Sequence, residues 1–432
     1  ASEIPAVLAK AFYIAKSGRP GPVLIDITKN AQLQLFDYEG YQKCNFIRSY
    51  KPQPDIRISY VEQAAELINQ AKKPFVIFGQ GVILGNAEKE FLQFIEKAGI
   101  PSAWTIMGMS AIPTNHPLAV GMLGMHGNYA PNLFTNECDV LIAIGMRFDD
   151  RVTGRLDKYA KQAQIIHLDI DPAEIDKNVQ VTVPVWGNCK ETLPLLTERV
   201  QQKSHHEWIS KFHKAIEIES EKLITPELFP QNGEITMGEV IQLINELTNG
   251  EAVMVTDVGQ HQMVTCRYSH QNKTRSNITS GGLGTMGFAL PAAIGAKYGA
   301  PERTVIAVMG DGGAQMNIQE LGTIMQFKPN VKILILNNSF LGMVRQWQEL
   351  FHEKRYSFTD IQSPDFVQVA KGYGIKGNKV ALREELKAAL QEMLAHPESY
   401  LLEVAVRMED NVFPMVPQGK GVSEIVLCKE DI

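Results

Sequence analysis

Two stretches of this chain decide its fold: Val305-Ile306-Ala307-Val308-Met309-Gly310-Asp311-Gly312 and Val331-Lys332-Ile333-Leu334-Ile335-Leu336-Asn337-Asn338. Each is an apolar run of strand length that ends in a short polar motif. Between the two stretches, residues 317–327 have helical spacing, with Ile318, Leu321, Ile324 and Met325 predicted on one face. Strand, helix and strand in this order predict two parallel strands joined by a right-handed crossover.

The two polar motifs are predicted to meet at one edge of the sheet, because open α/β sheets bind ligands at the carboxyl ends of their strands. The carboxylate of Asp311 and the amide of Asn338 form a small ligand set. Mg²⁺ bound in this way takes its other ligands from waters and phosphates. Gly312 and Gly313 let a phosphate approach the backbone and the following helix N-terminus. Either motif alone is more typical of a turn. Together they predict a diphosphate bound through Mg²⁺.

Length and composition limit the class of protein. The 432 residues suffice for two or three domains, and 44% hydrophobic and 21% charged residues are ordinary for a globular protein. A net charge of −6 without a long basic run argues against nucleic acid as a partner. No apolar run is long enough for a membrane span, and residues 1–5 do not resemble a signal peptide. The five cysteines are scattered, which indicates reduced thiols and a cytoplasmic location.

The order of predicted elements divides the chain into four parts. Residues 1–45 contain one helix (4–17) and one strand (23–27), too little for a core, and are interpreted as the end of a third domain plus a linker. Residues 50–200 alternate strands and helices. Residues 201–233 are a polar connector, and residues 234–432 alternate again. The predicted fold class is α/β, with two doubly wound parallel-sheet domains preceded by a stub of a third.

The individual elements follow from apolar periodicity. The predicted strands are 75–78, 140–144, 165–168, 252–256, 304–309, 331–336 and 400–406, with a weak strand at 277–279. The predicted helices are 60–70, 87–98, 236–247, 288–298, 318–327, 365–372 and 382–395.

Glycine-bearing loops follow or precede several of these elements. Residues 257–261 follow one strand and residues 281–287 precede a helix, so both loops can supply backbone N–H groups to a diphosphate. Gly282, Gly284 and Gly287 also match the dinucleotide fingerprint G-x-G-x-x-G. That fingerprint requires an acid at the end of the next strand. Here this acid is Asp311, which the metal site already uses, so NAD is not expected.

The paired motifs resemble the signature of thiamine diphosphate (ThDP) enzymes. Five stretches further resemble the catalytic subunits of acetohydroxyacid synthase, also called acetolactate synthase: residues 18–22, 123–127, 147–154, 282–287 and 337–348. The resemblance therefore covers essentially the whole chain. The resemblance implies a central FAD-binding domain and a domain that binds the ThDP diphosphate.

The resemblance assigns the ThDP site residue by residue. It implies that Asp311, Asn338 and the backbone carbonyl of Phe340 bind Mg²⁺. The positions around the diphosphate are Gly259, Gln260, His261, Gly284, Gly312 and Gly313. Met286 and Met343 match residues that support the bent cofactor, although methionine in such places is more often a core filler.

The resemblance also implies that FAD has a structural role in the central domain. The matching positions are Arg19, Gly79, Gly81, Thr105, Leu123, Gly124, Met125, His126, Gly127, Gly145, Arg147, Asp149 and Val152, with Met125 also assigned to the catalytic site. Asp169 and Asp171 suit the adenosine end, since an acid at a strand end accepts ribose hydroxyls. Asn188 stands where the family has aspartate. Without the resemblance, residues 147–151 would be interpreted as a surface loop with self-paired charges.

The implied reaction joins two 2-ketoacids with loss of CO₂, on the route to valine and isoleucine. Arg151 and Trp347 match the site of the second substrate, pyruvate or 2-ketobutyrate, where a guanidinium can bind a carboxylate. The family further implies a homodimer or homotetramer and a small regulatory subunit.

The sequence leaves three possibilities for the activity of this chain. The family's catalytic glutamate lies in an N-terminal pyrimidine-binding domain, and no glutamate of this chain matches it. We therefore expect the chain alone to lack full synthase activity. A related ThDP and FAD enzyme such as pyruvate oxidase is an alternative, which residues 346–348 disfavour. A fragment that binds cofactors without catalysis is another.

Overall fold

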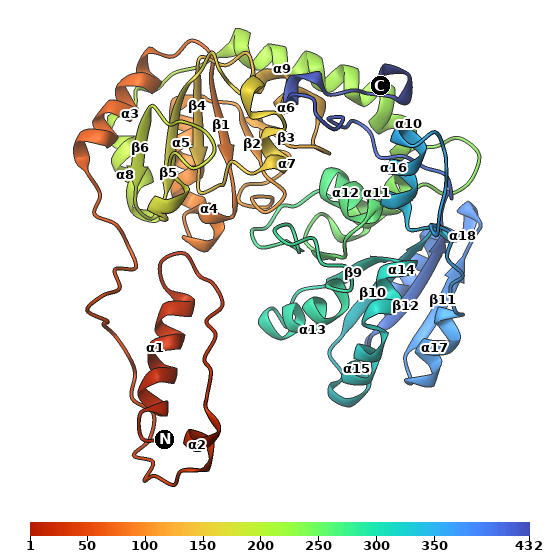
Figure 1. Cartoon of the computed structure of the whole chain (residues 1–432). Helices are drawn as coiled ribbons and strands as arrows, with labels where there is room; N and C mark the ends of the chain where they lie inside the picture. The colour runs from red at the N-terminus through yellow and green to blue at the C-terminus, as the bar shows by residue number, and fades with distance from the viewer.

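Two six-stranded sheets, in which all paired strands run parallel, organise the computed structural model, which describes residues 1–432. The two sheets form separate lobes, and an N-terminal segment extends away from both (Figure 1). This confirms the predicted α/β class with two parallel-sheet units. No helix is long and apolar enough to cross a membrane.

The first sheet has the strand order β3-β2-β1-β4-β5-β6. Its strands are β1 (Pro74–Phe78), β2 (Ser102–Trp104), β3 (Ala119–Met122), β4 (Val140–Ile144), β5 (Gln164–Asp169) and β6 (Val183–Trp186). Its helices are α3 (Ile58–Gln70), α4 (Gln80–Leu84), α5 (Glu88–Ala98), α6 (Tyr129–Thr135), α7 (Asp150–Thr153), α8 (Cys189–Arg199) and α9 (His206–Glu219), with 3₁₀ turns at Leu156–Lys158 and Pro172–Glu174.

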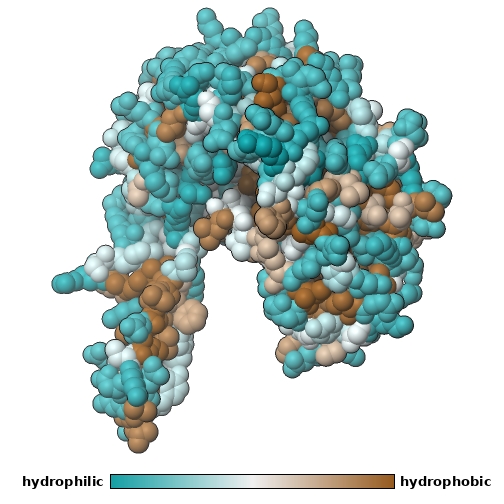
Figure 2. Space-filling view, turned by 45° about the vertical axis from the view of Figure 1, so that its right-hand side comes forward, coloured by the Kyte–Doolittle hydropathy of each residue, from teal (hydrophilic) through white to brown (hydrophobic).

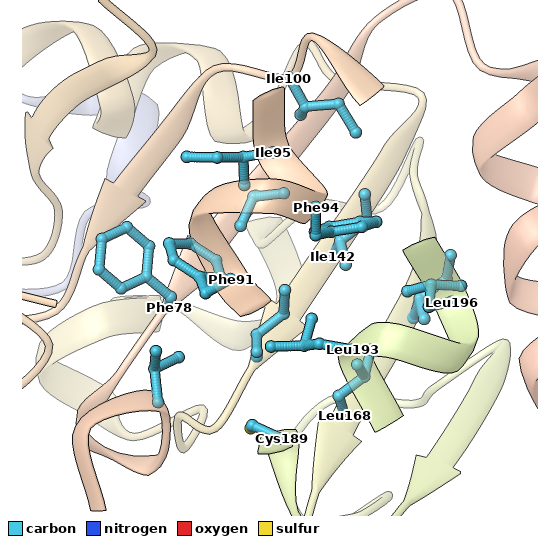
Figure 3. Close-up of a cluster of buried hydrophobic side chains, with 14 of the residues drawn as sticks. Phe78, Phe91, Phe94, Ile95, Ile100, Ile142, Leu168, Cys189, Leu193 and Leu196 are labelled. Atoms are coloured by element: carbon cyan, nitrogen blue, oxygen red, sulfur yellow. The ribbon is translucent and has the colours of Figure 1, made fainter. Parts of the chain in front are cut away.

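Alternate residues of these strands enter two cores, as a buried parallel sheet requires. Phe78, Ile142 and Leu168 pack beneath α3, α5 and α8, as Figure 3 shows around Phe91 and Leu193. Phe75, Leu141 and other residues of opposite parity pack against α6 and α9. Helices therefore cover both faces, and the carboxyl ends of β1 and β4 lie side by side at the point where the strand order reverses.

The second sheet has the strand order β11-β12-β10-β9-β7-β8. Its strands are β7 (Val253–Thr256), β8 (Asn277–Thr279), β9 (Val305–Gly310), β10 (Val331–Asn337), β11 (Lys376–Val380) and β12 (Tyr400–Ala405). Its helices are α10 (Thr225–Leu228), α11 (Met237–Thr248), α12 (Gln260–Tyr268), α13 (Ala289–Gly299), α14 (Asp311–Met316), α15 (Leu321–Phe327), α16 (Gly342–Phe351), α17 (Phe366–Gly372) and α18 (Arg383–Ala395). A π-helical turn, Ser220–Ile224, joins α9 to α10. Short 3₁₀ turns occur at Ile318–Glu320, Val422–Glu424 and Lys429–Asp431.

The N-terminal segment departs from its prediction. The helix is present as α1 (Ile4–Lys16), and a short helix, α2 (Lys29–Leu33), follows it. The predicted strand at 23–27 is not formed, and Leu24 is 95% exposed. An isolated strand has no neighbour for its backbone N–H and C=O groups, so apolar composition alone does not produce one. Hydrophobic atoms are accordingly visible on this extension (Figure 2).

Two further element predictions need correction. The helix predicted at 318–327 is formed, with a 3₁₀ turn over Ile318–Glu320 that continues into α15, but Met325 is 53% exposed instead of packing on the apolar face. Strands β2, β3, β6 and β11 were not predicted. They are short or carry few apolar residues, and they become strands by pairing with stronger neighbours.

Candidate functional site

Asp311 and Asn338 lie at adjacent strand ends, as predicted. The register of β9 and β10 pairs Gly310 with Leu336, which places both polar residues just beyond one edge of the sheet. Both are buried, at 1% and 4% exposure. Asp311 Oδ2 accepts a hydrogen bond from Ser363 Oγ at 3.1 Å, whereas its Oδ1 has no partner. A buried carboxylate oxygen without a partner is a costly arrangement that a cation would compensate.

The chemistry of the surrounding donors fits a hard cation with a hydrated or phosphate-filled shell. No group of three His, Cys, Asp or Glu side chains is placed to hold a metal ion. The set of side chains is instead one carboxylate and one amide, which suits Mg²⁺ completed by phosphate and water. Asn338 Nδ2 donates to Gln260 Oε1 at 3.2 Å, which fixes the orientation of the Asn338 amide.

The loop that carries Asn338 and Phe340 is held from outside by a buried carboxylate. Glu403 on β12 is 1% exposed, accepts a hydrogen bond from Asn337 Nδ2 at 2.8 Å and pairs with Lys379 at 2.8 Å. Asn337 Oδ1 in turn accepts the N–H of Ser339 at 3.0 Å. Ser339 has φ +58°, a left-handed conformation that this hydrogen bond helps to hold. The N–H of Phe340 donates to Asn338 Oδ1 at 3.3 Å, which keeps the Phe340 backbone beside Asn338. Asp311 and Asn338, the two candidate metal ligands, are called the metal pair below.

Three glycines at this edge are packed so closely against neighbouring side chains that a Cβ would collide with them. A Cβ on Gly313 would lie 1.9 Å from Asp257 Oδ2, and a Cβ on Gly310 would lie 2.9 Å from His261 Nδ1. A Cβ on Gly312 would lie 2.9 Å from Leu341 Cδ2 and 3.9 Å from Met286 Cε, which places Met286 beside this loop. The first turn of α14 can lie this close to Asp257 and Leu341 only because these residues are glycine, an arrangement that phosphate cradles also use.

A cleft of about 950 Å³ lies between the two lobes, and most of the remaining predicted residues line it. From the first lobe and the N-terminal segment these are Arg19, Gly79, Gly81, Thr105, Leu123, Gly124, Met125, His126, Gly127, Gly145, Arg147, Asp149, Arg151, Val152, Asp169 and Asn188. From the second lobe they are Gly259, Gly284, Met343 and Trp347. Residues far apart in the sequence therefore converge on one cavity of cofactor size.

The predicted residues outside this lining divide into two groups. Asp311 and Asn338 lie outside the cleft, and the predicted residues around these two side chains do so as well: Gln260, His261, Met286, Gly312, Gly313 and Phe340. Asp171 is engaged elsewhere: with Glu174 it holds Arg19 through ion pairs of 2.8 and 2.6 Å. Burial raises the pKa of the neighbouring Asp169 to about 6. Its carboxyl oxygen Oδ1 accepts the N–H of Asp171 at 2.8 Å.

The glycines at the ends of β1 and β4 have a packing role. The N–H of Gly81 donates to the carbonyl of Gly145 at 2.9 Å. A Cβ on Gly81 would lie 2.6 Å from Gly145 Cα. Gly145 has φ +56°. The two strand ends can approach each other only without side chains here, so these glycines shape the floor of the cleft before any ligand is considered.

The charged loop 147–151 pairs within itself. Asp149 caps α7 by accepting the N–H groups of Arg151 and Val152, and Asp149 also faces Arg147 at 3.5 Å. The Arg151 side chain is 69% exposed and lies 3.6 Å from Asp150, so its guanidinium remains accessible from the cleft. Across the cavity, the Trp347 ring packs on Phe351 with centroids 4.9 Å apart.

Comparison with known proteins matches both lobes to thiamine pyrophosphate enzymes. Residues 61–196 match the central domain of these enzymes, and residues 257–404 match their C-terminal TPP-binding domain. The chain is 41% identical to the acetolactate synthase large subunit of Buchnera aphidicola over 100% of the chain and 76% of that protein. The chain belongs to the acetolactate synthase large-subunit family.

Other members of the family give the same result. Identity is 40% to the acetolactate synthase large subunit of Haemophilus influenzae and 39% to the isozyme 2 large subunit of Escherichia coli. The chain spans 76% and 75% of these two proteins. It is thus a ThDP-dependent enzyme of the acetolactate synthase type, in which the metal pair and glycine loops described above lie in the TPP-binding region.

In this acetolactate synthase-type chain, three residues near the site escaped prediction from sequence: the buried Asp257 and Glu403, and the half-buried Ser363. Asp257 is fully buried, and its Oδ1 accepts the N–H of Phe288 at 3.1 Å. Asp257 is the first residue of the predicted glycine loop 257–261, so its position directly after a strand was a usable signal. Ser363 and Glu403 reach the site from segments that carry no recognisable motif, so only the fold reveals them.

His261 gives a first testable prediction. Burial lowers the pKa of His261 to about 4, so the folded chain binds a proton less readily than the unfolded chain, and stability falls as pH falls below about 6.5. Between pH 7 and pH 5 this group alone costs about 2 kcal/mol. Thermal unfolding of the cofactor-free His261→Gln variant should therefore show a smaller drop in Tm over this range than the parent. Equal drops would contradict this pKa.

Proposed function

We propose that this chain supplies the ThDP and FAD sites of an acetolactate synthase, which joins pyruvate to a second 2-ketoacid and releases CO₂. The products are 2-acetolactate or 2-aceto-2-hydroxybutyrate. The observation that carries the proposal is the shared cleft, where Arg151 and Met125 of the first lobe face Met343 and Trp347 of the second. Fold alone would not distinguish among ThDP enzymes, whereas this set of side chains suits a 2-ketoacid.

The diphosphate end of the cofactor is assigned to the metal pair. Asp311, Asn338 and the Phe340 carbonyl hold Mg²⁺, and N–H groups at Gly312 and Gly313 face the phosphates. The unpartnered Asp311 Oδ1 and the glycine cradle support this assignment. ThDP, when bound, supplies the carbanion chemistry. Met286 and Met343 support its rings, and Gly259, Gln260, His261 and Gly284 complete the surroundings.

FAD is assigned to the cleft wall of the first lobe. The cavity volume of about 950 Å³ accommodates a large cofactor. His126 lines it with Nδ1 lacking a partner, and burial lowers the His126 pKa to about 4, so a neutral imidazole is available for hydrogen bonding. The acids Asp169 and Asp171 lie at the adenosine end, and binding there would compete with the Arg19 ion pair.

The second substrate is assigned to Arg151 and Trp347. The exposed guanidinium can bind a carboxylate with two hydrogen bonds. The indole covers the extra methyl of 2-ketobutyrate, whose burial is worth about 1 kcal/mol. In the assembled enzyme, Trp347→Leu is expected to lower the preference for 2-ketobutyrate over pyruvate roughly fivefold, as product ratios under competition would show. An unchanged ratio would remove Trp347 from the specificity site.

The 432-residue chain alone is proposed to have low synthase activity. The cleft is lined by a single glutamate, Glu174, and this residue is paired with Arg19. No unpaired glutamate of this chain therefore lines the cleft to activate the pyrimidine end of ThDP. A homodimer or homotetramer and a small regulatory subunit would complete the enzyme, in the cytoplasm.

The test incubates the purified chain with ThDP, Mg²⁺, FAD and pyruvate. We expect saturable binding of Mg²⁺–ThDP and FAD by calorimetry with little acetolactate. Turnover equal to that of a full-length relative would overturn the proposal of low activity. Acetyl phosphate formed from pyruvate, phosphate and oxygen would instead identify a pyruvate oxidase. Absence of ThDP binding would overturn the site assignment itself.

A further inference from the structure

A buried ion pair outside the proposed site joins the two lobes. Arg267, in the last turn of α12, lies 2.8 Å from Glu219 at the end of α9 (Nη2 to Oε1). Both side chains are 1% exposed. Removing one partner of such a pair leaves a buried charge uncompensated. By contrast, Lys273 and Glu251 form a surface pair of 2.7 Å with 52% and 51% exposure, which provides a matched control.

On the side of the first lobe, Glu219 anchors the end of the loop 122–128, which lines the cleft. Its carboxylate accepts hydrogen bonds from Asn128 Nδ2 at 3.0 Å and from the N–H of Tyr129 at 2.8 Å. Asn128 also bridges the ends of its own loop: its Oδ1 accepts the N–H of Met122 at 2.9 Å, and its N–H donates to the Met122 carbonyl at 2.6 Å. The intervening residues 123–127 all line the cleft.

On the other side, Arg267 holds the helix that leads to the metal pair. The helix α12 is nine residues long and begins at Gln260, which bonds to Asn338. Arg267 Nη1 also donates to the carbonyl of Phe413 in the C-terminal segment. The guanidinium therefore joins α12 to two other chain segments, and its charge is favourable at the C-terminal end of a helix.

We propose that Arg267 and Glu219 form an interdomain latch, which positions the Met122–Asn128 loop relative to α12. The latch touches neither substrate nor cofactor. The loop lines one wall of the cleft, and Gln262 and Met263 in the first turn of α12 line another part of it. The ion pair therefore fixes the width of the cavity. The part of this inference that concerns FAD rests on the proposed function, whereas the positioning of the loop does not.

The test uses hydrogen–deuterium exchange of the cofactor-free 432-residue chain. The loop suits this measurement, because the N–H groups of Leu123, Gly124, Met125, Gly127 and Asn128 all donate hydrogen bonds. Glu219→Gln, Arg267→Met and the double variant should each raise loop exchange at least tenfold. Amides of β4 serve as an internal reference and should not change. Arg267→Lys, which keeps the charge, should recover part of the protection, and Lys273→Met should have no effect.

A second measurement separates the latch from the flavin assignment. Quenching of FAD fluorescence should show at least a tenfold weaker Kd in the latch variants, with the double variant no worse than either single variant. Faster loop exchange with unchanged FAD affinity would support the latch and overturn FAD binding at this loop. If only Glu219→Gln affects the loop, Glu219 is a local cap and the latch is overturned. Equal increases in the loop and β4 would overturn it as well, since they indicate global unfolding.

Discussion

Asp311→Asn is expected to reduce Mg²⁺-dependent ThDP binding by roughly 100-fold or more while leaving the cofactor-free chain at least as stable as the parent. Loss of an outer-shell partner already costs a metal site 10- to 100-fold, and a directly bound carboxylate contributes more. Asp311 Oδ1 is buried without a partner, so the negative charge that binds the cation destabilises the fold when no cation is bound.

The sign of the stability effect follows from the pKa. Burial raises the pKa of Asp311 to about 6, so between about pH 4 and pH 6 the folded chain holds a proton that the unfolded chain has lost. The free energy of unfolding therefore falls as pH rises through this window, and at pH 7 the ionised carboxylate costs about 2–3 kcal/mol. Asparagine removes this cost, although its unpartnered amide N–H₂ offsets part of the gain.

Two measurements check this pair of effects. Calorimetric titration with ThDP should show saturable binding to the parent at millimolar Mg²⁺ and weak binding to Asp311→Asn. Thermal unfolding without cofactors at pH 7.5 should give a Tm for the variant equal to or above that of the parent. The exposed Asp37→Asn should change neither quantity. A variant that binds Mg²⁺–ThDP normally would exclude Asp311 as a ligand, and a clearly lower Tm would show that its carboxylate stabilises the fold.

The metal pair could be predicted from sequence because both residues end strong apolar strands. Once β9 and β10 are parallel neighbours, their register brings Asp311 and Asn338 together whatever the rest of the chain does. Strand β11 shows the opposite case. Its sequence, Lys-Gly-Asn-Lys-Val, has almost no apolar character, and it extends only because β12 offers a complete row of partners. Residues 23–27 have the apolar character and lack the partner.

The supporting residues could not be predicted for a related reason. Glu403 lies within an apolar strand, where sequence reasoning predicts a packing residue, yet it is buried with Asn337 and Lys379 as partners. Glu219 and Arg267 each belong to an ordinary amphipathic helix, and only the packing of the lobes brings them within 2.8 Å. The local sequence pattern predicts helices and strands and the residues at which they end. A buried polar contact depends instead on how those helices and strands pack in the tertiary structure.

Gly313→Ala is expected to destabilise the chain by about 1–3 kcal/mol, the usual range for overpacking a filled interior. Helix propensity predicts the opposite sign, since alanine is favoured over glycine by about 1 kcal/mol inside a helix. The physical reason is Asp257: an added Cβ would lie 1.9 Å from its Oδ2. Asp257 is fully buried and bonded to the N–H of Phe288, so it cannot turn away freely. The first turn of α14 must move instead, and ThDP binding should weaken at least tenfold.

A second helical glycine makes this test specific. Gly295 lies inside α13 with no atom within 4 Å of an added Cβ. Gly295→Ala is therefore expected to stabilise the chain by about 0.5–1 kcal/mol, so the same substitution in two helices should have opposite signs in urea unfolding. In the Asp257→Ala background, Gly313→Ala should cost less than in the parent, because the clashing oxygen is gone. If Gly313→Ala behaves like Gly295→Ala, the carboxylate does not confine α14, and the cradle owes its shape to other contacts.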